Sequence, residues 1–468
     1  MIFTSKDQSN FAELSQDFNP MHCDEVLSRR YIYGEPVVHG INAMIFAIKE
    51  WSNLITFSFL ITSLKCKFTK PIFLNKKISI DIKNIHDSIK INILQNNEIR
   101  MTITLEIIES DHEEFYLREY DPHTKNIPND IAFNDLDDYS RTIGCTINTE
   151  LAKQYYSDEF INKIGFLQLA EILSFSRIVG MHSPGLNSIF SELNFYNHAS
   201  HGNDIFFKVK SLDDRFNIVN IESIGPNFIS NIRAFYRPIQ VNQKKISDIK
   251  KDLKKNEFKD FRALVIGASR GLGEFTAKCL GYGGASLLLT YAKGKDDILN
   301  VVDDIQIYNK NISILELDIT KISEMNYELI NQFNPTHVFY YATPFIFNAT
   351  KNKFSDEIYN KFKLFYFDAF KNIVENIAIS KNKTYFLYPS SIAVEEKPVD
   401  MLEYSFAKKE GEDLCLILEK QYSNIKIYCP RLPRLETDQT VSLSSVNNQD
   451  PIKILDIIRS MNKKPKFF

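Results

Sequence analysis

The stretch that most constrains the fold runs from Ala263 to Glu274 and reads Ala-Leu-Val-Ile-Gly-Ala-Ser-Arg-Gly-Leu-Gly-Glu. Four apolar residues, typical of a buried parallel strand, lead directly into Gly267, Gly271 and Gly273, and a helical apolar pattern follows. Glycine is needed where φ is positive or where backbone closely approaches a phosphate. The N-terminus of the next helix offers N–H groups and a positive dipole to an anion. The sequence therefore predicts a strand–turn–helix unit suited to a pyrophosphate.

Apolar strands alternate with helical patterns from Phe261 to the end of the chain, as in a parallel sheet covered by helices on both faces. Such sheets bind ligands beyond the carboxyl ends of their strands. We therefore expect an α/β Rossmann-type, doubly wound domain over residues 261–468. Its strands are predicted at 263–267, 285–291, 312–317, 336–341, 383–389 and 424–429.

Tyr404 and Lys408 are spaced to share one face of a helix. A nearby ammonium lowers the pKa of a phenol, so Tyr404 is expected to donate a proton at neutral pH. Ser391 lies thirteen residues upstream, just past a predicted strand. A Tyr–Lys pair alone is common by chance on a solvated helix face. Combined with the glycine turn and Ser391, it predicts a catalytic site.

The G-x-x-x-G-x-G spacing, Ser391 and the Y-x-x-x-K pair together resemble the short-chain dehydrogenases/reductases. The resemblance implies that Tyr404 is the general acid, that Ser391 binds a substrate carbonyl and that Lys408 also contacts the nicotinamide ribose. It further implies that Asp318 contacts adenine and Thr437 the carboxamide. The cofactor contacts expected on this basis are Gly267, Ser269, Arg270, Gly271, Leu272, Gly273, Lys293, Asp318, Ile319, Ala342, Lys408 and Thr437.

The cofactor choice is predicted from charge. Members of this family that prefer NAD carry an acidic residue after the second strand, which bonds the ribose hydroxyls. Here Leu289-Thr-Tyr-Ala-Lys293 contains no carboxylate, and Arg270 lies within the glycine turn. Two cations and no anion suit a 2′-phosphate, so we predict NADPH. A solvated surface charge is an equally good interpretation of Lys293 alone.

Three features depart from the resembled family. Its Asn-Asn-Ala-Gly segment is replaced by Tyr340-Tyr-Ala-Thr343, and Phe365 takes the position of its catalytic Asn. The usual proton relay through Lys408 is therefore rerouted or absent. The chain also ends soon after the helical pattern 451–461, so the family's last strand is expected to be missing.

The N-terminal region carries a second motif, Asp17-Phe-Asn-Pro-Met-His22, followed by Pro36-Val-Val-His39-Gly40. Both motifs resemble those of MaoC-like, (R)-specific enoyl-CoA hydratases and dehydratases. Moving water across a carbon–carbon double bond needs a carboxylate and an imidazole on one side of the substrate. Asp17 and His22 are therefore predicted to be catalytic, although a turn cap and a structural histidine are the alternative. We expect backbone N–H groups near Gly40 to polarise the thioester carbonyl, and His39 to be structural.

A pattern of one apolar helix followed by four strands occurs twice in residues 1–240. The helices are expected at 41–54 and 161–180. We predict an α+β double hotdog with two antiparallel meanders, against the alternative of two unrelated α+β pieces. The domains are a catalytic MaoC-like hotdog over 1–125, a second hotdog without catalytic residues over 126–240, a linker over 241–260 and the reductase domain over 261–468. His182, in the second repeat, is interpreted first as part of a helix-ending turn.

The composition excludes several classes of function. The net charge of −3 provides no basic field for nucleic acid. The six cysteines lack metal-ligand spacing and indicate a reduced, cytoplasmic protein without a metal. No signal peptide or membrane span is expected.

The two motifs together predict a bifunctional acyl-thioester enzyme. It would reduce a 3-oxoacyl thioester of CoA or acyl carrier protein with NADPH, and interconvert 3-hydroxyacyl and 2-enoyl thioesters. The alternatives are a hydratase with a divergent reductase domain and a non-catalytic acyl-binding or scaffold protein. Both resembled families commonly self-associate, so a homo-oligomer is expected.

Overall fold

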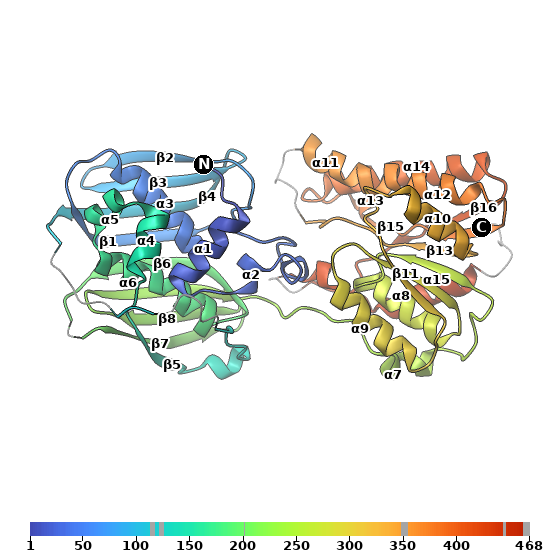
Figure 1. Ribbon diagram of the computed structural model, residues 1–468, viewed down its shortest axis with the longest axis horizontal. Helices are drawn as coiled ribbons and strands as arrows, with labels where there is room; N and C mark the ends of the chain where they lie inside the picture. The colour runs from blue at the N-terminus through green and yellow to red at the C-terminus, as the bar shows by residue number, and fades with distance from the viewer. Residues whose placement is uncertain (113–117, 121–125, 201, 348–353, 443–445, 462–468) are drawn as a thin grey trace. The chain divides into compact units, whose positions relative to one another are not determined.

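The computed structural model describes residues 1–112, 118–120, 126–200, 202–347, 354–442 and 446–461. The chain forms two compact units, Met1–Ile239 and Gln240–Phe468 (Figure 1). No single helix among the described residues is long and apolar enough to cross a membrane, although the bent pair Asp158–Ile164 and Phe166–His182 passes that test by length and composition.

In the first unit, one helix followed by four strands occurs twice. The first set is α3 (Gly40–Ser52), β1 (Phe59–Phe68), β2 (Ile78–Ile85), β3 (Ser88–Gln95) and β4 (Glu98–Glu109). The second set is α6 (Phe166–Arg177), β6 (Ser188–Asn197), β7 (Asp204–Asp213), β8 (Ile218–Ile224) and β9 (Phe228–Tyr236). In each set the first strand pairs with the last, giving the orders β2-β3-β4-β1 and β6-β9-β8-β7. The prediction of two simple meanders was therefore wrong for β1 and β6.

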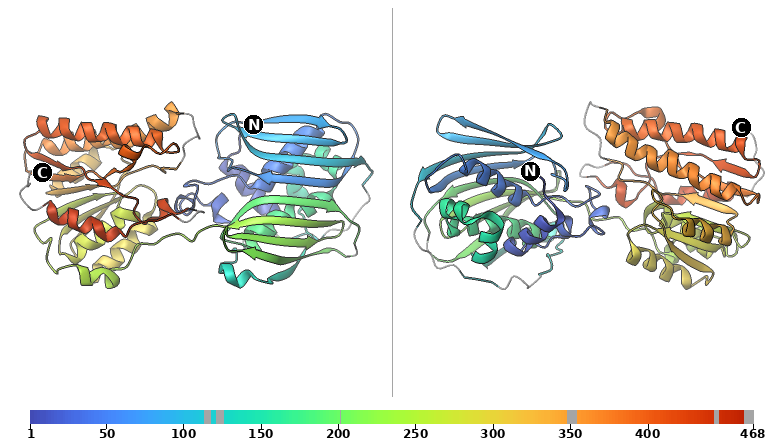
Figure 2. Two further views of the ribbon diagram at one scale, coloured as in Figure 1. Left: turned by 180° about the vertical axis from the view of Figure 1, so that it is seen from behind. Right: turned by 45° about the horizontal axis from the view of Figure 1, so that its top comes forward.

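The two sets join into one sheet, because β1 pairs antiparallel with β6. With β5 (Ser140–Gly144), which the sequence reading missed, the sheet has nine strands. Alternate residues of the strands point inward, as the pattern of burial along β9 shows. The sheet curves around α3 and α6 (Figure 2), and buried residues from both halves form one continuous core.

The helical run predicted over 161–180 is interrupted. Gly165, at φ 77°, separates α5 (Asp158–Ile164) from α6, and α6 continues into a wider π-helical turn at Ile178–His182. A positive φ is a conformation that glycine adopts without strain, so the break falls where the sequence allows it. The wider turn matters for the site because it carries Gly180.

The second unit is a six-stranded parallel sheet with the order β12-β11-β10-β13-β14-β16. Its strands are β10 (Arg262–Ile266), β11 (Ser286–Tyr291), β12 (Ile312–Glu316), β13 (His337–Tyr340), β14 (Thr384–Leu387) and β16 (Ile425–Tyr428). In chain order this is 3-2-1-4-5-6, the arrangement of dinucleotide-binding doubly wound sheets. Among the described residues of this unit no seventh strand joins the sheet.

Helices cover both faces of this sheet, each over its own core (Figure 1). One face carries α8 (Gly271–Tyr282), α9 (Lys295–Gln306) and α15 (Ile454–Ser460). The other carries α10 (Glu324–Phe333), α12 (Phe370–Ala378) and α14 (Leu402–Gln421). The segment predicted as a linker is partly structural: Ile246, Ile249 and Phe258 are buried in the α8 core. Its few apolar residues stand among many charged ones, which hid the short helix that forms at Ile246–Ile249.

Candidate active sites

The segment that carries Asp17 and His22 is fixed to the second half of the first unit. Asp17 lies in the loop between α1 (Ser5–Ser15) and α2 (Pro20–Cys23), and His22 lies in α2, which Asn19 caps by accepting a hydrogen bond from the Met21 N–H. The amide nitrogen of Asn19 donates to the carbonyl oxygens of Gly180 and Gly185, both at 3.0 Å. Asn19 therefore holds the loop against the end of α6, more than 160 residues away in the chain.

The Asp17 carboxylate is buried between its own loop and α6. Ser176 donates its hydroxyl to Oδ2 at 2.7 Å, and the Asn19 N–H donates to Oδ1 at 3.2 Å. Gly180 packs directly against it, because a Cβ at that position would lie 2.3 Å from Oδ1. Burial raises the pKa of Asp17, and the neighbouring His22 and Ser176 only partly offset this. The carboxyl group is thus positioned, dehydrated and easier to protonate than a surface aspartate.

His22 has one ring nitrogen occupied. Its Nδ1 lies 2.7 Å from the carbonyl oxygen of Val37, which can only accept a hydrogen bond. Nδ1 therefore carries the proton, and Nε2 is the nitrogen with a lone pair. Burial lowers the pKa of His22, although Asp17 opposes this shift. A neutral imidazole beside a carboxyl group is the arrangement that proton transfer requires.

His39 supports this pair. Its ring stacks on His22 with centroids 3.9 Å apart. Its Nδ1 lies 2.9 Å from Oε1 of Gln8 and its Nε2 lies 3.1 Å from the backbone oxygen of Asp17. Burial, followed by the nearby His22, lowers the pKa of His39 well below its usual value. Both nitrogens thus face oxygen atoms of the first unit, and His39 connects α1, the Asp17 loop and the start of α3.

One ligand atom each of Asp17, His22 and His39 lies within 4.8 Å of the others, close enough to consider a metal ion. However, both nitrogens of His39 and Nδ1 of His22 already face oxygen atoms. Only the Asp17 carboxylate and His22 Nε2 remain. Two donors are fewer than the three protein ligands of a catalytic zinc site. The cluster therefore fits acid–base chemistry better than metal binding.

Gly40 is the first residue of α3, where backbone N–H groups have no partner within the helix. A Cβ there would lie 2.6 Å from the Phe68 ring, so the close approach of β1 requires glycine. The two sequence motifs contain Asp17, His22, His39 and Gly40. Gln8, Ser176 and Gly180 contact these residues but lie in segments without any recognisable motif, so the sequence did not indicate them.

In the second unit the glycine turn has the conformation its sequence predicts. Gly267 and Gly271 have φ of 81° and 58°. A Cβ on Gly273 would lie 2.1 Å from the carbonyl oxygen of Gly267, so only glycine lets α8 start this close to the turn. Ala342 and Tyr341 contact the same turn from the end of β13. These residues fit the diphosphate of a dinucleotide at the N-terminus of α8.

The Arg270 side chain has an ionic partner within the protein. Its guanidinium forms an ion pair of 2.7 Å with Asp438, whose side chain is almost fully buried. Thr437 and Asp438 both lie beside Gly271, within 3.8 Å of where its Cβ would be. The structure thus brings both Thr437 and a carboxylate to the turn. The charge argument for a 2′-phosphate did not include Asp438, because that residue is 168 positions from Arg270 in the sequence.

The remaining predicted cofactor residues surround the same edge of the sheet. Ser269 is buried in the turn and Leu272 is half-buried in the first turn of α8. Lys293 follows β11 and is exposed. Asp318 follows β12 and accepts hydrogen bonds from the backbone N–H and hydroxyl of Thr320, and Ile319 beside it is buried.

Ser391, Tyr404 and Lys408 meet beyond the end of β14. Ser391 is fixed by the short β15 (Ser390–Ser391), which pairs with β17 (Arg431–Leu432), and it is a hydrogen-bond partner of the Tyr404 phenol. Burial raises the pKa of Tyr404 to about 12 and lowers the pKa of Lys408 to about 7. The predicted lowering of the Tyr404 pKa was wrong, because burial raises this pKa by more than the hydrogen bond to Ser391 lowers it.

Lys408 is oriented by aromatic rings rather than by the missing Asn. Its Nζ donates to the carbonyl oxygen of Pro389 at 2.7 Å and lies 3.9 Å from the centroid of the Tyr366 ring. Tyr366 is buried and its hydroxyl lies 2.5 Å from Oγ1 of Thr343. Tyr366 follows Phe365, and Thr343 ends the altered segment Tyr340–Thr343. The contact between Tyr366 and Thr343 therefore joins the two places where the sequence departs from the resembled family. The sequence reading noted those departures but not the contact between them.

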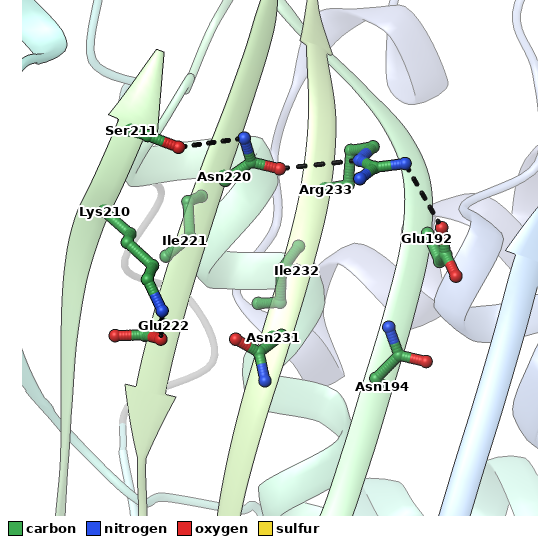
Figure 3. Close-up of a pocket in the computed structure, with 10 residues that line it drawn as sticks. All are labelled: Glu192, Asn194, Lys210, Ser211, Asn220, Ile221, Glu222, Asn231, Ile232 and Arg233. Atoms are coloured by element: carbon green, nitrogen blue, oxygen red, sulfur yellow. Dashed lines mark hydrogen bonds and ion pairs between the residues drawn. The ribbon is translucent and has the colours of Figure 1, made fainter. Parts of the chain in front are cut away.

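A further hollow, of about 360 Å³, lies on the solvent-facing side of β6–β9 (Figure 3). Its cations and anions pair with one another: Lys210 with Glu222, and Arg233 with Glu192 at 3.6 Å. Asn220 links Ser211 to Arg233 between them (Figure 3). A self-neutralised sheet face of this kind has no unpaired acid, base or nucleophile for catalysis, so it is not a candidate active site.

Comparison with known proteins finds one family match and a set of similar solved structures. Residues 2–109 match the family described as "MaoC like domain". No curated protein matches the chain. Solved structures similar to the chain include the oxidoreductase yciK of E. coli (15% identity, TM-score 0.40, covering 44% of this chain and 91% of that one). A short-chain dehydrogenase of Shigella flexneri complexed with NADP (15%, 0.40, 44% and 93%) and the angucycline C-6 ketoreductase LanV with bound NADP (16%, 0.36, 45% and 83%) are also similar.

Residues 2–109 therefore form a MaoC-like domain. The chain joins this domain to structure whose solved neighbours are short-chain dehydrogenases/reductases, as the two sequence resemblances predicted.

Proposed function

We propose that the chain is a bifunctional acyl-thioester enzyme in which the first unit, a double hotdog, interconverts 3-hydroxyacyl and 2-enoyl thioesters. In dehydration, Nε2 of His22 accepts the proton from C2, and the carboxyl group of Asp17 donates a proton to the C3 hydroxyl. The hydroxyl leaves as water, and hydration reverses both transfers. The N–H groups at Gly40 hold the thioester oxygen as negative charge develops on it. The observation that carries this proposal is the buried Asp17 carboxyl group close to His22, whose Nδ1 faces the Val37 carbonyl oxygen and so leaves Nε2 available.

The second unit is proposed to reduce a 3-oxoacyl thioester of CoA or acyl carrier protein. The glycine turn and Thr437 would hold NADPH, which supplies a hydride to the C3 carbonyl carbon. Ser391 positions the carbonyl oxygen, and Tyr404 donates a proton to it. Lys408 lies close enough to influence Tyr404, whose ring centroid is 6.0 Å from Nζ. The product of this reduction is the substrate of the first unit, which gives the fusion a chemical reason.

Two observations favour a second candidate, in which only the first unit is catalytic. Phe365 replaces the Asn of the proton relay, and Asp438 places a buried carboxylate beside the turn that would hold a diphosphate. In that case the second unit would be a divergent reductase for another carbonyl, or a binding module.

Purified protein should be incubated with acetoacetyl-CoA and NADPH, and separately with crotonyl-CoA, with acyl products identified by mass spectrometry. Asp17→Asn should abolish hydration of crotonyl-CoA and leave NADPH oxidation intact. Tyr404→Phe should do the reverse. Hydration without NADPH oxidation would support the second candidate. If Asp17→Asn still hydrates crotonyl-CoA and Tyr404→Phe still oxidises NADPH, the assignment of the sites is refuted.

A further inference from the structure

A second pocket in the first unit, of about 290 Å³, has a different character from the self-neutralised face. It lies at the end of α6, and its described lining residues include Arg141, Arg177 and His182 but no carboxylate. Gln16, Asn129 and Met181 also line it, so the polar groups around the two guanidinium groups are amides and an imidazole. A concave site whose described lining has two cations and no carboxylate attracts a negatively charged group.

Arg177 is held by hydrogen bonds from its two terminal nitrogens. Its Nη1 donates to Oε1 of Gln16 at 2.8 Å and to the hydroxyl of Thr146 at 3.2 Å, and its Nη2 donates to the carbonyl oxygen of Gly144. Its Nε–H is buried and has no hydrogen-bond partner among the residues that the structure describes. All three acceptors are uncharged, so nothing in these contacts neutralises the guanidinium. A buried donor on an uncompensated cation is costly unless a ligand satisfies it.

His182 and Arg141 complete the cationic side. Arg141 Nη1 lies 3.5 Å from Nδ1 of His182. Burial, then Arg141 and Arg177, lower the pKa of His182 to about 4, so the ring is neutral at pH 7 and adds a polar edge instead of a third charge. The two arginines therefore supply the positive charge, and the planar guanidinium fork suits phosphate and carboxylate oxygens.

The pocket adjoins the Asp17 site through the same helix end. Ser176 and Gly180 face the Asp17 carboxylate, and Arg177 and Met181 line the pocket. On the other side, Gln16 precedes Asp17 in the chain, and the Phe18 N–H donates to the sulfur of Met181 at 3.2 Å. A substrate that reaches Asp17 is therefore within reach of the pocket as well.

We infer that the Arg141–Arg177–His182 pocket binds an anionic group of the thioester substrate, a phosphate or a carboxylate. The inference rests on the proposed hydratase function of the first unit. The anion has two sources: a phosphate of the carrier, or a carboxylate at the far end of the acyl chain. In either case the second half of the unit, which carries this pocket, selects the substrate. The first half, which carries Asp17 and His22, then converts it.

Three thioesters separate the sources: crotonyl-CoA, the uncharged crotonyl N-acetylcysteamine thioester, and a 2-enoyl N-acetylcysteamine thioester with a terminal carboxylate. Arg141→Gln is the test variant, because Arg141 is exposed and Arg177 has structural contacts. Arg215→Gln is the control, because it removes another exposed arginine, one paired with Asp213 in the turn between β7 and β8 of the same sheet.

We expect Arg141→Gln to raise KM about tenfold for one charged thioester, as for loss of one charge-assisted hydrogen bond, without changing kcat. An effect on crotonyl-CoA identifies a carrier phosphate, and an effect on the carboxylated ester identifies the acyl chain. The inference is overturned if Arg141→Gln equals Arg215→Gln on all three esters, or changes all three equally. If the wild-type protein hydrates none, the proposed function fails, and calorimetric titration with inorganic pyrophosphate then tests the pocket. Binding that Arg141→Gln loses supports the inference, and equal binding or none overturns it.

Discussion

Replacing Gly180 with alanine tests whether the second half of the first unit shapes the Asp17 site. The added Cβ would lie 2.3 Å from Oδ1 and 2.4 Å from Oδ2 of Asp17, whereas ordinary contact begins at 3.4 Å. The carboxylate or the helix end must therefore move by about 1 Å, and a misplacement of that size costs about 100-fold in rate. The overpacking itself should destabilise the unit by about 1–3 kcal/mol.

The assay for Gly180→Ala is the initial rate of crotonyl-CoA hydration, followed by loss of enoyl absorbance. A thermal unfolding scan accompanies it, since about 1 kcal/mol shifts Tm by roughly 2–4 °C for a unit of this size. Ser176→Ala is the comparison, because it removes the hydrogen bond to Oδ2 without adding volume and should have the smaller effect on rate. A Gly180→Ala protein with wild-type kcat and Tm would refute the reasoning, because the carboxylate would then not need this space. A folded variant with a large loss of kcat and unchanged NADPH oxidation would support it.

The other predictions concern both units. Gln8→Leu should lower the hydration rate with a small change in Tm, because His39 loses the acceptor that fixes its ring beside His22; unchanged kinetics would contradict this. Asp438→Asn should lower the Kd for NADPH by about tenfold, measured by nucleotide fluorescence, because it removes a buried anion from the glycine turn; weaker binding would show instead that Asp438 positions Arg270. Burial lowers the pKa of Lys408 from 10.5 to about 7, so the folded state favours the neutral amine. Below pH 10.5 the unfolded chain binds a proton that the folded chain does not, so the free energy of unfolding falls as the pH drops from 10.5 to 7. Urea unfolding of the second unit should therefore show lower stability at pH 7 than at pH 9, and Lys408→Met should reduce that difference; an unchanged difference would exclude Lys408 as its source.

The short motifs of both units could be predicted from sequence because each acts over a few neighbouring residues. The glycine turn is an example: Gly273 is required by the carbonyl of Gly267, six positions away. The Asp17–His22 spacing is similarly local, since one loop and the cap of α2 position both side chains. The strands of the parallel sheet were also predictable, because buried strands are continuous apolar runs.

What only the tertiary structure decided is which distant groups surround those motifs. Ser176 and Gly180 reach Asp17 because β1 pairs with β6 and brings α6 into the shared core, a contact with no trace in local periodicity. Asp438 neutralises Arg270 across 168 residues, and the burial that shifts the pKa of Lys408 depends on side chains from several helices and strands. Sequence by itself therefore determined the chemical groups and the backbone that carries them. Their charge, protonation and room to move depend on burial and on long-range contacts, which arise only when the chain is folded.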